Sequence, residues 1–279
     1  MSSIATASRP SLKERLYWGV SDIWAVTQRN LIAYTRIPEA LVFSSIQPIM
    51  FVLLFVYVFG GAMSTPGFRY VDFIIPGIFV QTVCFGAVTT GVGLAEDLNK
   101  GLIERFRSLP MARSAVLVGR TASDVIYNVL SVVIMAITGL LVGWRIRSSI
   151  VDAVAGFVLL LLFAYAFSWV MAYIGLLVPS VEVINQASFM VLFPLTFVAN
   201  TFVPAENLPS VLQTFAEWNP VSAVTQASRE LFDNVPDGVA EPGAWPLANS
   251  ELYTLIWVVA LTAVFAPLSV RQYRRTTQH

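Results

Sequence analysis

The chain has 279 residues, of which 56% are hydrophobic and 12% are charged, and its mean hydropathy is +0.70. A soluble chain carries about 25% charged residues, so this sequence has too little charge to cover a soluble surface. The 17 basic and 17 acidic residues cancel, and this balance argues against a nucleic-acid partner. One histidine and one cysteine exclude the ligand clusters that structural zinc requires. Composition therefore predicts a polytopic membrane protein.

Six apolar runs match the length of a membrane-spanning helix, which takes about 20 residues. They cover residues 41–60, 71–95, 117–144, 153–178, 183–203 and 252–270. These runs are too long for the strands of a membrane barrel, which need roughly 9–11 residues, and lipid offers no partner for open backbone groups. We therefore predict an all-α protein with one six-span transmembrane domain over residues 41–270.

Basic residues predict the orientation of these spans. Thirteen of the 17 lysines and arginines fall in residues 1–40, 96–120 and 271–279, which six spans would place on one side. The excess of Lys and Arg marks the cytoplasmic side, so we expect a cytoplasmic N-terminal segment, a cytoplasmic tail over 271–279, and both termini inside. Arg145 and Arg147, in a short loop on the other side, oppose this orientation.

Residues 11–37 have the pattern of an amphipathic helix within the N-terminal segment. Apolar residues recur there at helical spacing between charged ones, and Trp18 and Trp24 are side chains typical of a membrane interface. We expect this helix to lie on the cytoplasmic leaflet. The alternative is a linker helix that packs on the protein itself.

Residues 96–113 form the most charged stretch of the chain. Leu98, Leu102 and Phe106 follow one another at four-residue intervals, and Pro110 ends the pattern. Two interpretations are open. The segment is a short amphipathic helix shaped to dock into a groove of a soluble partner, or it is a solvated loop that obeys the positive-inside rule.

Residues 204–250 form a polar segment on the outer side. Apolar residues at helical spacing predict two short amphipathic helices over 204–233, separated by a break at Trp218, Asn219 and Pro220. Residues 234–250 are rich in Pro, Gly and Asn and predict a loop. We expect the two helices to insert partly into the membrane or to cap the spans.

Motifs for enzymatic chemistry are missing from the sequence. Neither Lys13 nor Lys100 belongs to a phosphate-binding loop, and no zinc-protease motif or nucleophile elbow occurs. The fourth to sixth runs contain no charged residue, although ion-coupled transporters usually keep ionisable groups near the middle of the membrane. We therefore expect no catalytic residue and no cofactor or metal bound by this chain, and an external source of energy.

Two groups of residues within the runs have both a structural and a functional interpretation. Arg120 and Asp124 lie four residues apart on one helix face near the cytoplasmic boundary, so they can pair. The pair either only stabilises the helix or also transmits the motion of a partner. The fourth run is crowded with aromatic residues that line a hydrophobic path or pack against neighbours: Phe163, Tyr165, Phe167, Trp169 and Tyr173.

Two stretches carry a resemblance to a known family. They are DLNKGLIERFRSLPMARSAVLVGR, residues 97–120, and FVPAENLPSVLQTFAEWNPVSAVTQASRELF, residues 202–232. Both resemble segments of the ABC type-2 exporter permeases of the daunorubicin-resistance kind. The order of elements, from the N-terminal helix through six spans to outer helices before the last span, also matches that family.

The resemblance implies partners and a role for each matched position. A separate ATPase subunit, in two copies, would hold ATP and Mg, and a second permease, identical or paralogous, would complete the transmembrane body. The residues implied to seat a coupling helix on the ATPase and to end it are Gly101, Glu104, Arg105, Arg107, Pro110 and Arg113. The residues implied to shape the outer re-entrant region are Trp218, Asn219 and Pro220.

The resemblance and the missing motifs together predict a permease subunit of an ATP-driven exporter in the bacterial cytoplasmic membrane. Spans with few polar groups suit a hydrophobic or amphiphilic cargo, such as a drug, a polyketide or a lipid. The alternative is a membrane-embedded lipid-modifying enzyme or assembly scaffold, with Glu96, Asp97 and Glu104 as acid–base groups. The next cytoplasmic loop would add only Glu182, so few groups could converge on such a site. Import instead of export stays open.

Overall fold

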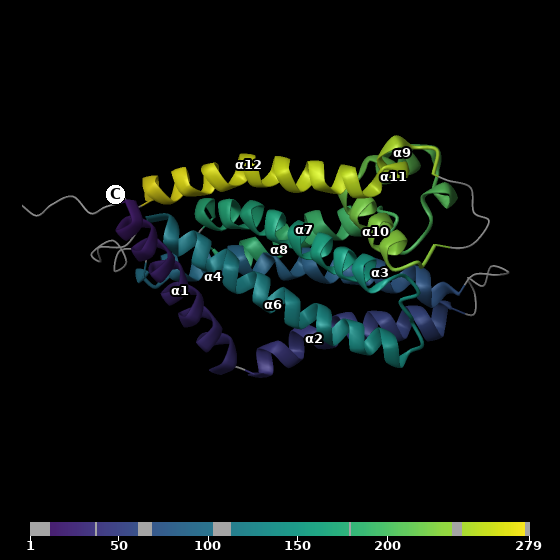
Figure 1. Ribbon diagram of the computed structural model, residues 1–279, viewed down its shortest axis with the longest axis horizontal. Helices are drawn as coiled ribbons and strands as arrows, with labels where there is room; N and C mark the ends of the chain where they lie inside the picture. Colours follow the sequence, from purple (N-terminus) through teal and green to yellow (C-terminus); the bar gives the residue numbers. More distant parts are fainter. Residues whose placement is uncertain are drawn as a thin grey trace, which may run out of the picture.

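The structure, a computed structural model, describes residues 12–36, 38–60, 69–102, 113–178, 180–235 and 242–276. Every regular element within these ranges is helical, which confirms the all-α class predicted from the sequence. The long helices run lengthwise through the molecule, and short helices gather at one end of them (Figure 1).

The helices define two ends of the bundle. At one end α1 crosses the long helices steeply and α12 finishes; at the other end lie α9, α10 and α11 (Figure 1). We call these the α1 end and the α10 end. The elements are α1 (Leu12–Arg36), α2 (Pro38–Leu53), η1 (Leu54–Phe59, a π-helix), α3 (Tyr70–Gly86), α4 (Val88–Asn99), α6 (Arg113–Leu141), α7 (Ile150–Leu177), α8 (Val181–Phe197), η2 (Ala205–Asn207), α9 (Ser210–Trp218), α10 (Pro220–Leu231), α11 (Trp245–Ala248) and α12 (Ser250–Thr276).

Four helical stretches are long and apolar enough to cross a membrane. They are Tyr70–Asn99, Ala115–Leu141, Ile150–Leu177 and Ser250–Arg275, and they coincide with the second, third, fourth and sixth predicted runs. The first and fifth runs contain shorter apolar helices, Ser45–Val58 and Val181–Phe197. The structure therefore supports a polytopic helical membrane protein, while the count of six spans stays a prediction.

The fifth run, predicted over residues 183–203, is helical only to Phe197. Around that point α10 and its cap residue Asn219 bind backbone groups of the run. The backbone N–H of Asn200 donates to Ser222 Oγ at 2.8 Å, and Asn219 Nδ2 donates to the Leu195 carbonyl at 2.8 Å. Because α10 takes up these groups, the chain turns away after α8 instead of continuing as a helix.

The second run, predicted as one span over residues 71–95, is broken near its middle. The stretch Tyr70–Asn99 is mostly buried in the protein, and it divides into α3 and α4 at Ala87, which forms a turn. Nearly every residue of α3 is buried, and its apolar residues Ile74, Ile78 and Val83 are fully buried although they lie on different sides of the helix. This continuous burial shows that α3 and α4 form the central element around which the other helices pack.

A pair of glycines brings α4 against α7. A Cβ placed on Gly175 would lie 2.4 Å from the carbonyl oxygen of Gly91 and 2.7 Å from its Cα. Such close approach of two helix backbones needs residues without side chains. The two glycines therefore fix the distance between the central helix and α7.

Gly175→Ala should lower the thermal unfolding midpoint of the purified protein, because the new methyl group meets backbone atoms that cannot rotate away. Overpacking of this kind costs about 1–3 kcal/mol. Gly19→Ala on α1 is the control, since nothing lies within 4 Å of a Cβ there. A Gly175→Ala variant as stable as the wild type would contradict the close crossing.

Candidate functional site

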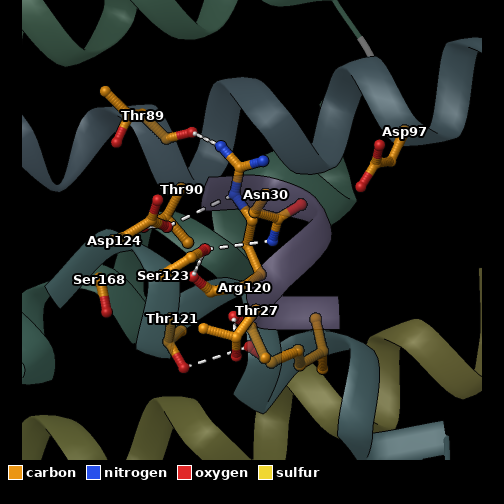
Figure 2. Close-up of polar contacts among 12 residues, drawn as sticks. Thr27, Asn30, Thr89, Thr90, Asp97, Arg120, Thr121, Ser123, Asp124 and Ser168 are labelled. Atoms are coloured by element: carbon orange, nitrogen blue, oxygen red, sulfur yellow. Dashed lines mark hydrogen bonds and ion pairs between the residues drawn. The ribbon is translucent and has the colours of Figure 1, made fainter. Parts of the chain in front are cut away.

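A buried ion pair lies where α6 meets the first turn of α4. Arg120 Nε lies 3.5 Å from Asp124 Oδ2, and the Asp124 side chain is completely buried. Thr90 Oγ1 donates to the same carboxylate oxygen at 2.5 Å, and Arg120 Nη2 donates to the Thr89 carbonyl at 2.8 Å (Figure 2). The two charges are four residues apart on α6 and both reach α4.

The guanidinium of Arg120 fits against α4 because of a glycine. A Cβ on Gly93 would lie 2.0 Å from Arg120 Nη2 and 2.1 Å from Cζ. Any larger residue at this position would displace the guanidinium from the Thr89 carbonyl. On α4, Thr90 thus supplies the donor to Asp124, Thr89 supplies the acceptor for Arg120, and Gly93 leaves the space that the guanidinium occupies.

The N-terminal helix α1 joins the same cluster from its other side. Asn30 Nδ2 donates to Ser123 Oγ at 3.1 Å, and Ser123 Oγ donates to the Arg120 carbonyl at 2.7 Å (Figure 2). Thr27 Oγ1 lies 3.2 Å from the Gly119 carbonyl and donates towards it. We call the buried or half-buried residues that connect the three helices the α1–α4–α6 cluster: Thr27, Asn30, Thr89, Thr90, Arg120, Ser123 and Asp124.

An ion pair at the edge of the cluster connects α1 to the last turns of α4. Arg29 Nη2 lies 2.9 Å from Asp97 Oδ2, and Asn30 Oδ1 accepts from Arg29 Nε and Nη2 at 3.1 and 2.8 Å. Asp97 stands near the end of α4, where the chain leads into the predicted coupling segment. The charge-assisted hydrogen bond between Arg29 and Asp97 therefore attaches the start of this segment to α1.

The coupling residues inferred from the resemblance fall partly beyond what the structure describes. Gly101 is described and has φ +63°, the left-handed conformation with which glycine ends many helices. Its N–H donates to the Leu98 carbonyl at 3.0 Å. Arg113 is the first residue of α6, and its side chain is not described. Four more lie outside the described residues: Glu104, Arg105, Arg107 and Pro110.

The outer residues inferred from the resemblance are described in full. Asn219 caps α10, since its Oδ1 accepts from the Val221 N–H at 2.9 Å, and Pro220 occupies the first turn. Trp218 ends α9, exposes half of its side chain, and accepts at its carbonyl from the Tyr253 hydroxyl at 3.0 Å. These residues form the corner between α9 and α10.

Arg229, on α10, is a functional candidate that the sequence alone did not single out. It is 2% exposed, its Nε and Nη2 donate to the Phe73 and Thr201 carbonyls at 2.9 and 3.1 Å, and its guanidinium lies 3.5 Å from the centroid of the Phe73 ring. Burial lowers the pKa of Arg229 to about 9, and burial also raises the pKa of the neighbouring Glu230. A lone arginine among small residues on a predicted amphipathic helix is the sequence signal that could have found it.

The arginines that oppose the positive-inside rule have a local structural role. Arg145 Nη1 donates to the Leu140 and Trp144 carbonyls, each at 2.7 Å, and Arg69 Nη2 donates to the Gly143 carbonyl at 2.7 Å. These carbonyls lie at the C-terminal end of α6, where a positive charge is favourable. Arg147 pairs with Asp72 at 2.7 Å. The exception in charge distribution is therefore explained by helix capping and ion pairing.

Aromatic residues form a continuous column that the sequence analysis missed. In the fourth run, Phe163 and Trp169 are buried in the core, which leaves them little room to line an open path. Instead, seven rings with neighbouring centroids 4.0 to 6.3 Å apart connect α8 with α2, η1 and α3. This phenylalanine column consists of Phe51, Phe55, Phe85, Phe189, Phe193, Phe197 and Phe202. Only their four-residue spacing on α8 was visible in the sequence.

The fold and the α1–α4–α6 cluster define a class: a multi-pass helical membrane protein in which a polar cluster ties an N-terminal helix to two long apolar helices. The chain belongs to the ABC-2 type transporter family, whose sequence profile matches residues 21–232. The chain is thus a membrane permease component of an ABC transporter.

Relatives named as permeases extend this family assignment over nearly the whole chain. A daunorubicin resistance ABC transporter permease of Streptomyces coeruleorubidus is 33% identical over 276 residues, covering 99% of this chain and 93% of that protein. A probable doxorubicin resistance ABC transporter permease of Mycobacterium tuberculosis is 23% identical over 255 residues, covering 91% and 88%. An inner membrane transport permease of Escherichia coli K12 is 24% identical over 233 residues, covering 80% and 86%.

Asp124→Asn should destabilise the protein strongly, because it leaves the charge of Arg120 without its buried acid. Removing one partner of a buried pair costs about 3–5 kcal/mol. The measurement is denaturant unfolding in detergent, with Asp152→Asn, at an exposed carboxylate on the first turn of α7, as the control. The double replacement Arg120→Met with Asp124→Leu should cost less than the sum of the single changes. Additive effects would contradict a coupled pair.

Proposed function

We propose that the chain is the permease subunit of an ATP-driven exporter that moves a hydrophobic or amphiphilic compound, such as a drug, a polyketide or a lipid, out across the bacterial cytoplasmic membrane. In this proposal α2 with η1, α3 with α4, α6, α7, α8 and α12 are the six spans, and both termini lie in the cytoplasm. The basic residues near the α1 end support this orientation. Relatives named for daunorubicin and doxorubicin resistance support a drug as cargo.

The observation that carries the proposal is the position of the α1–α4–α6 cluster. Residues 103–112 connect α4 to α6, and the cluster ties those two helices to each other and to α1. A displacement of the connecting segment would therefore reach α4 through Asp97 and α6 through Arg113. Packed helices respond to such a displacement as rigid bodies.

In the proposed mechanism two ATPase subunits hold ATP and Mg, and each seats one coupling helix. ATP binding on those subunits moves the coupling helix, and the α1–α4–α6 cluster passes the motion to the central helix. A second permease, identical or paralogous, completes the transmembrane body. This chain contributes no residue to ATP hydrolysis.

On the substrate side we propose that cargo moves along the phenylalanine column. Two of its rings are substantially exposed, with Phe189 at 52% and Phe193 at 38%, while Phe202 is buried near the α10 end. The column thus leads from the exposed surface of α8 to the outer helices. Ring faces attract apolar and aromatic groups without specific hydrogen bonds, which suits a cargo of variable structure.

Two of the three acidic residues offered for lipid chemistry, Glu96 and Asp97, are engaged in ion pairs, and Glu104 lies outside the described residues. Asp97 pairs with Arg29 at 2.9 Å, and Glu96 pairs with Lys100 at 2.8 Å. Each of these two carboxylates is paired with a different cation, so the described structure does not bring the two together on one group. These contacts favour a transport role over a lipid-modifying enzyme.

Co-purification in mild detergent with the ATPase encoded beside this chain tests the coupling role. The Glu104→Arg, Arg107→Glu double change should reduce the recovered ATPase at least about tenfold, which corresponds to about 1.4 kcal/mol. Glu206→Arg at the α10 end is the control and should retain the ATPase. If the ATPase associates with neither the wild type nor the control, although both stay folded, the permease proposal fails.

Transport of doxorubicin into inside-out vesicles tests the phenylalanine column. Phe193→Ala and Phe197→Ala should each reduce the initial rate about two- to tenfold, since an aromatic pair contributes about 0.5–1.5 kcal/mol. Phe265→Ala removes a ring that pairs with Tyr173, at 6.0 Å, outside the column, and should leave the rate nearly unchanged. Equal losses in all three variants would contradict a role for the column.

A further inference from the structure

Arg229 is a buried cation with one donor nitrogen left over. Its Nε and Nη2 donate to two carbonyls, whereas Nη1 is buried and has no hydrogen-bond partner. Both carboxylate oxygens of the neighbouring Glu230 accept elsewhere, from Gln226 Nε2 and Ser250 Oγ. No ion pair joins Arg229 to an acid in the part of the chain that the structure describes. Its charge is therefore buried without a counterion, although buried charges are normally paired.

Two more polar atoms without a partner lie beside Arg229, in the turn after α8. They are the Thr201 hydroxyl and Oδ1 of Asn200, and both are buried. The same two residues contact α10 through their other polar groups. The Thr201 carbonyl accepts from Arg229 Nη2 at 3.1 Å, and Asn200 Nδ2 donates to Gln226 Oε1 at 3.2 Å. The turn and α10 thus bring a charged donor, a hydroxyl and an amide oxygen into one buried region.

The charge of Arg229 indicates what kind of group is missing. Buried polar atoms in folded proteins nearly always have a hydrogen-bond partner. A water molecule would satisfy a single donor, but it would leave the charge uncompensated. With a pKa of about 9, the guanidinium stays protonated at pH 7. An anionic oxygen supplies both the acceptor and the countercharge, because a guanidinium binds carboxylates and phosphates by charge-assisted hydrogen bonds.

The unpartnered atoms lie at the buried end of the phenylalanine column. Phe202, which follows Thr201 directly, is buried and stacks on Phe197 with ring centroids 4.5 Å apart. The Phe73 ring lies 3.5 Å from the guanidinium carbon of Arg229. Aromatic rings therefore surround the approach to the charge, and they suit the apolar body of a molecule whose polar end reaches Arg229.

We propose that Arg229, Thr201 and Asn200 form the polar end of the cargo path and bind an anionic oxygen of an amphiphile, such as a carboxylate, sulfonate or phosphate. Arg229 Nη1 and the Thr201 hydroxyl donate to that oxygen, and Asn200 Oδ1 accepts from a hydroxyl beside it. The apolar body of the amphiphile lies against the phenylalanine column. This inference rests on the proposed function, because it assigns a specificity site to the proposed path.

The site is closed in this structure. Asn200, Thr201 and Arg229 are 7%, 0% and 2% exposed. Binding of an amphiphile therefore requires α10 and the turn after α8 to separate. The buried cation also disfavours a positively charged group at this position, since like charges repel.

Two matched fluorescent probes test the proposal on the purified chain in phosphatidylcholine nanodiscs. Anilinonaphthalene sulfonate and phenylnaphthylamine share one aromatic body, and only the first carries an anionic group. After subtraction of binding to empty nanodiscs, the wild type should bind the sulfonate about tenfold or more tightly than the neutral probe, because a hydrogen bond to a charged group is stronger than a neutral one. Arg229→Met should abolish this preference and keep the affinity for the neutral probe.

Thr201→Val is a second variant that removes only the unpartnered hydroxyl. It should lower the preference about two- to tenfold, as expected for one lost hydrogen bond. The thermal unfolding midpoint should not fall, because no hydrogen bond of the closed structure is lost. Thr225→Val on α10 is the matched control, since the Thr225 hydroxyl already donates to the Val221 carbonyl at 2.7 Å. This control should retain the full preference.

Three outcomes would overturn the anion site. Equal affinity of the wild type for both probes would show that water satisfies these atoms. An unchanged preference in Arg229→Met or Thr201→Val would place the anion elsewhere. Displacement of the sulfonate probe by inorganic phosphate would indicate a site for a free ion, without a need for the apolar body. The binding needs no ATPase, so loss of ATPase co-purification would count against the proposed function alone, and loss of the preference against the anion site alone.

Discussion

The cost of burying charge in a medium without water is the constraint on which the α1 end depends. Asp124 is fully buried, and such a carboxylate is tolerated only when nearby groups satisfy it. Arg120 pairs with Asp124, and Thr90 donates a hydrogen bond to it. Arg120 in turn donates to the Thr89 carbonyl on α4. Ser123 donates to the Arg120 carbonyl and accepts from Asn30 of α1. One buried acid thereby fixes the relative positions of three helices.

The same constraint operates at the α10 end with a buried cation. Arg229 is buried, so carbonyls of α3 and of the turn after α8 accept from its Nε and Nη2, and the Phe73 ring covers its face. Asn219 supplies a second tie between α10 and α8. Between these two polar regions the contacts are mainly apolar, as in the core around Ile78, Phe79 and Phe163. Apolar contacts are not directional, so helices can shift there more easily than at either end.

Sequence patterns predicted the features that arise within one helix. Long apolar runs located the four long helices, and the four-residue spacing of Arg120 and Asp124 predicted that they could meet. The features set by contacts between distant segments were not predictable. The early end of α8 depends on Ser222 and Asn219, the burial of Arg229 on α3, and the phenylalanine column on four separate elements. Hydropathy reports how apolar a segment is, and it carries no information on which neighbour will satisfy a backbone group.

The break at Ala87 separates α4, which the polar cluster holds, from α3, which other contacts hold. A helix that ran unbroken from Tyr70 to Asn99 would carry a displacement at Asp97 directly to Tyr70. In this protein α4 is held by the α1–α4–α6 cluster and crosses α7 through Gly91, whereas α3 is held by Arg229 and by the apolar core. α4 is therefore anchored at the α1 end of the molecule and α3 at the α10 end, and the two helices meet at the turn at Ala87. In the proposed mechanism, a movement that begins at residues 103–112 would change the angle between α4 and α3, and with it the contact of Phe85 on α3 with Phe189 of α8.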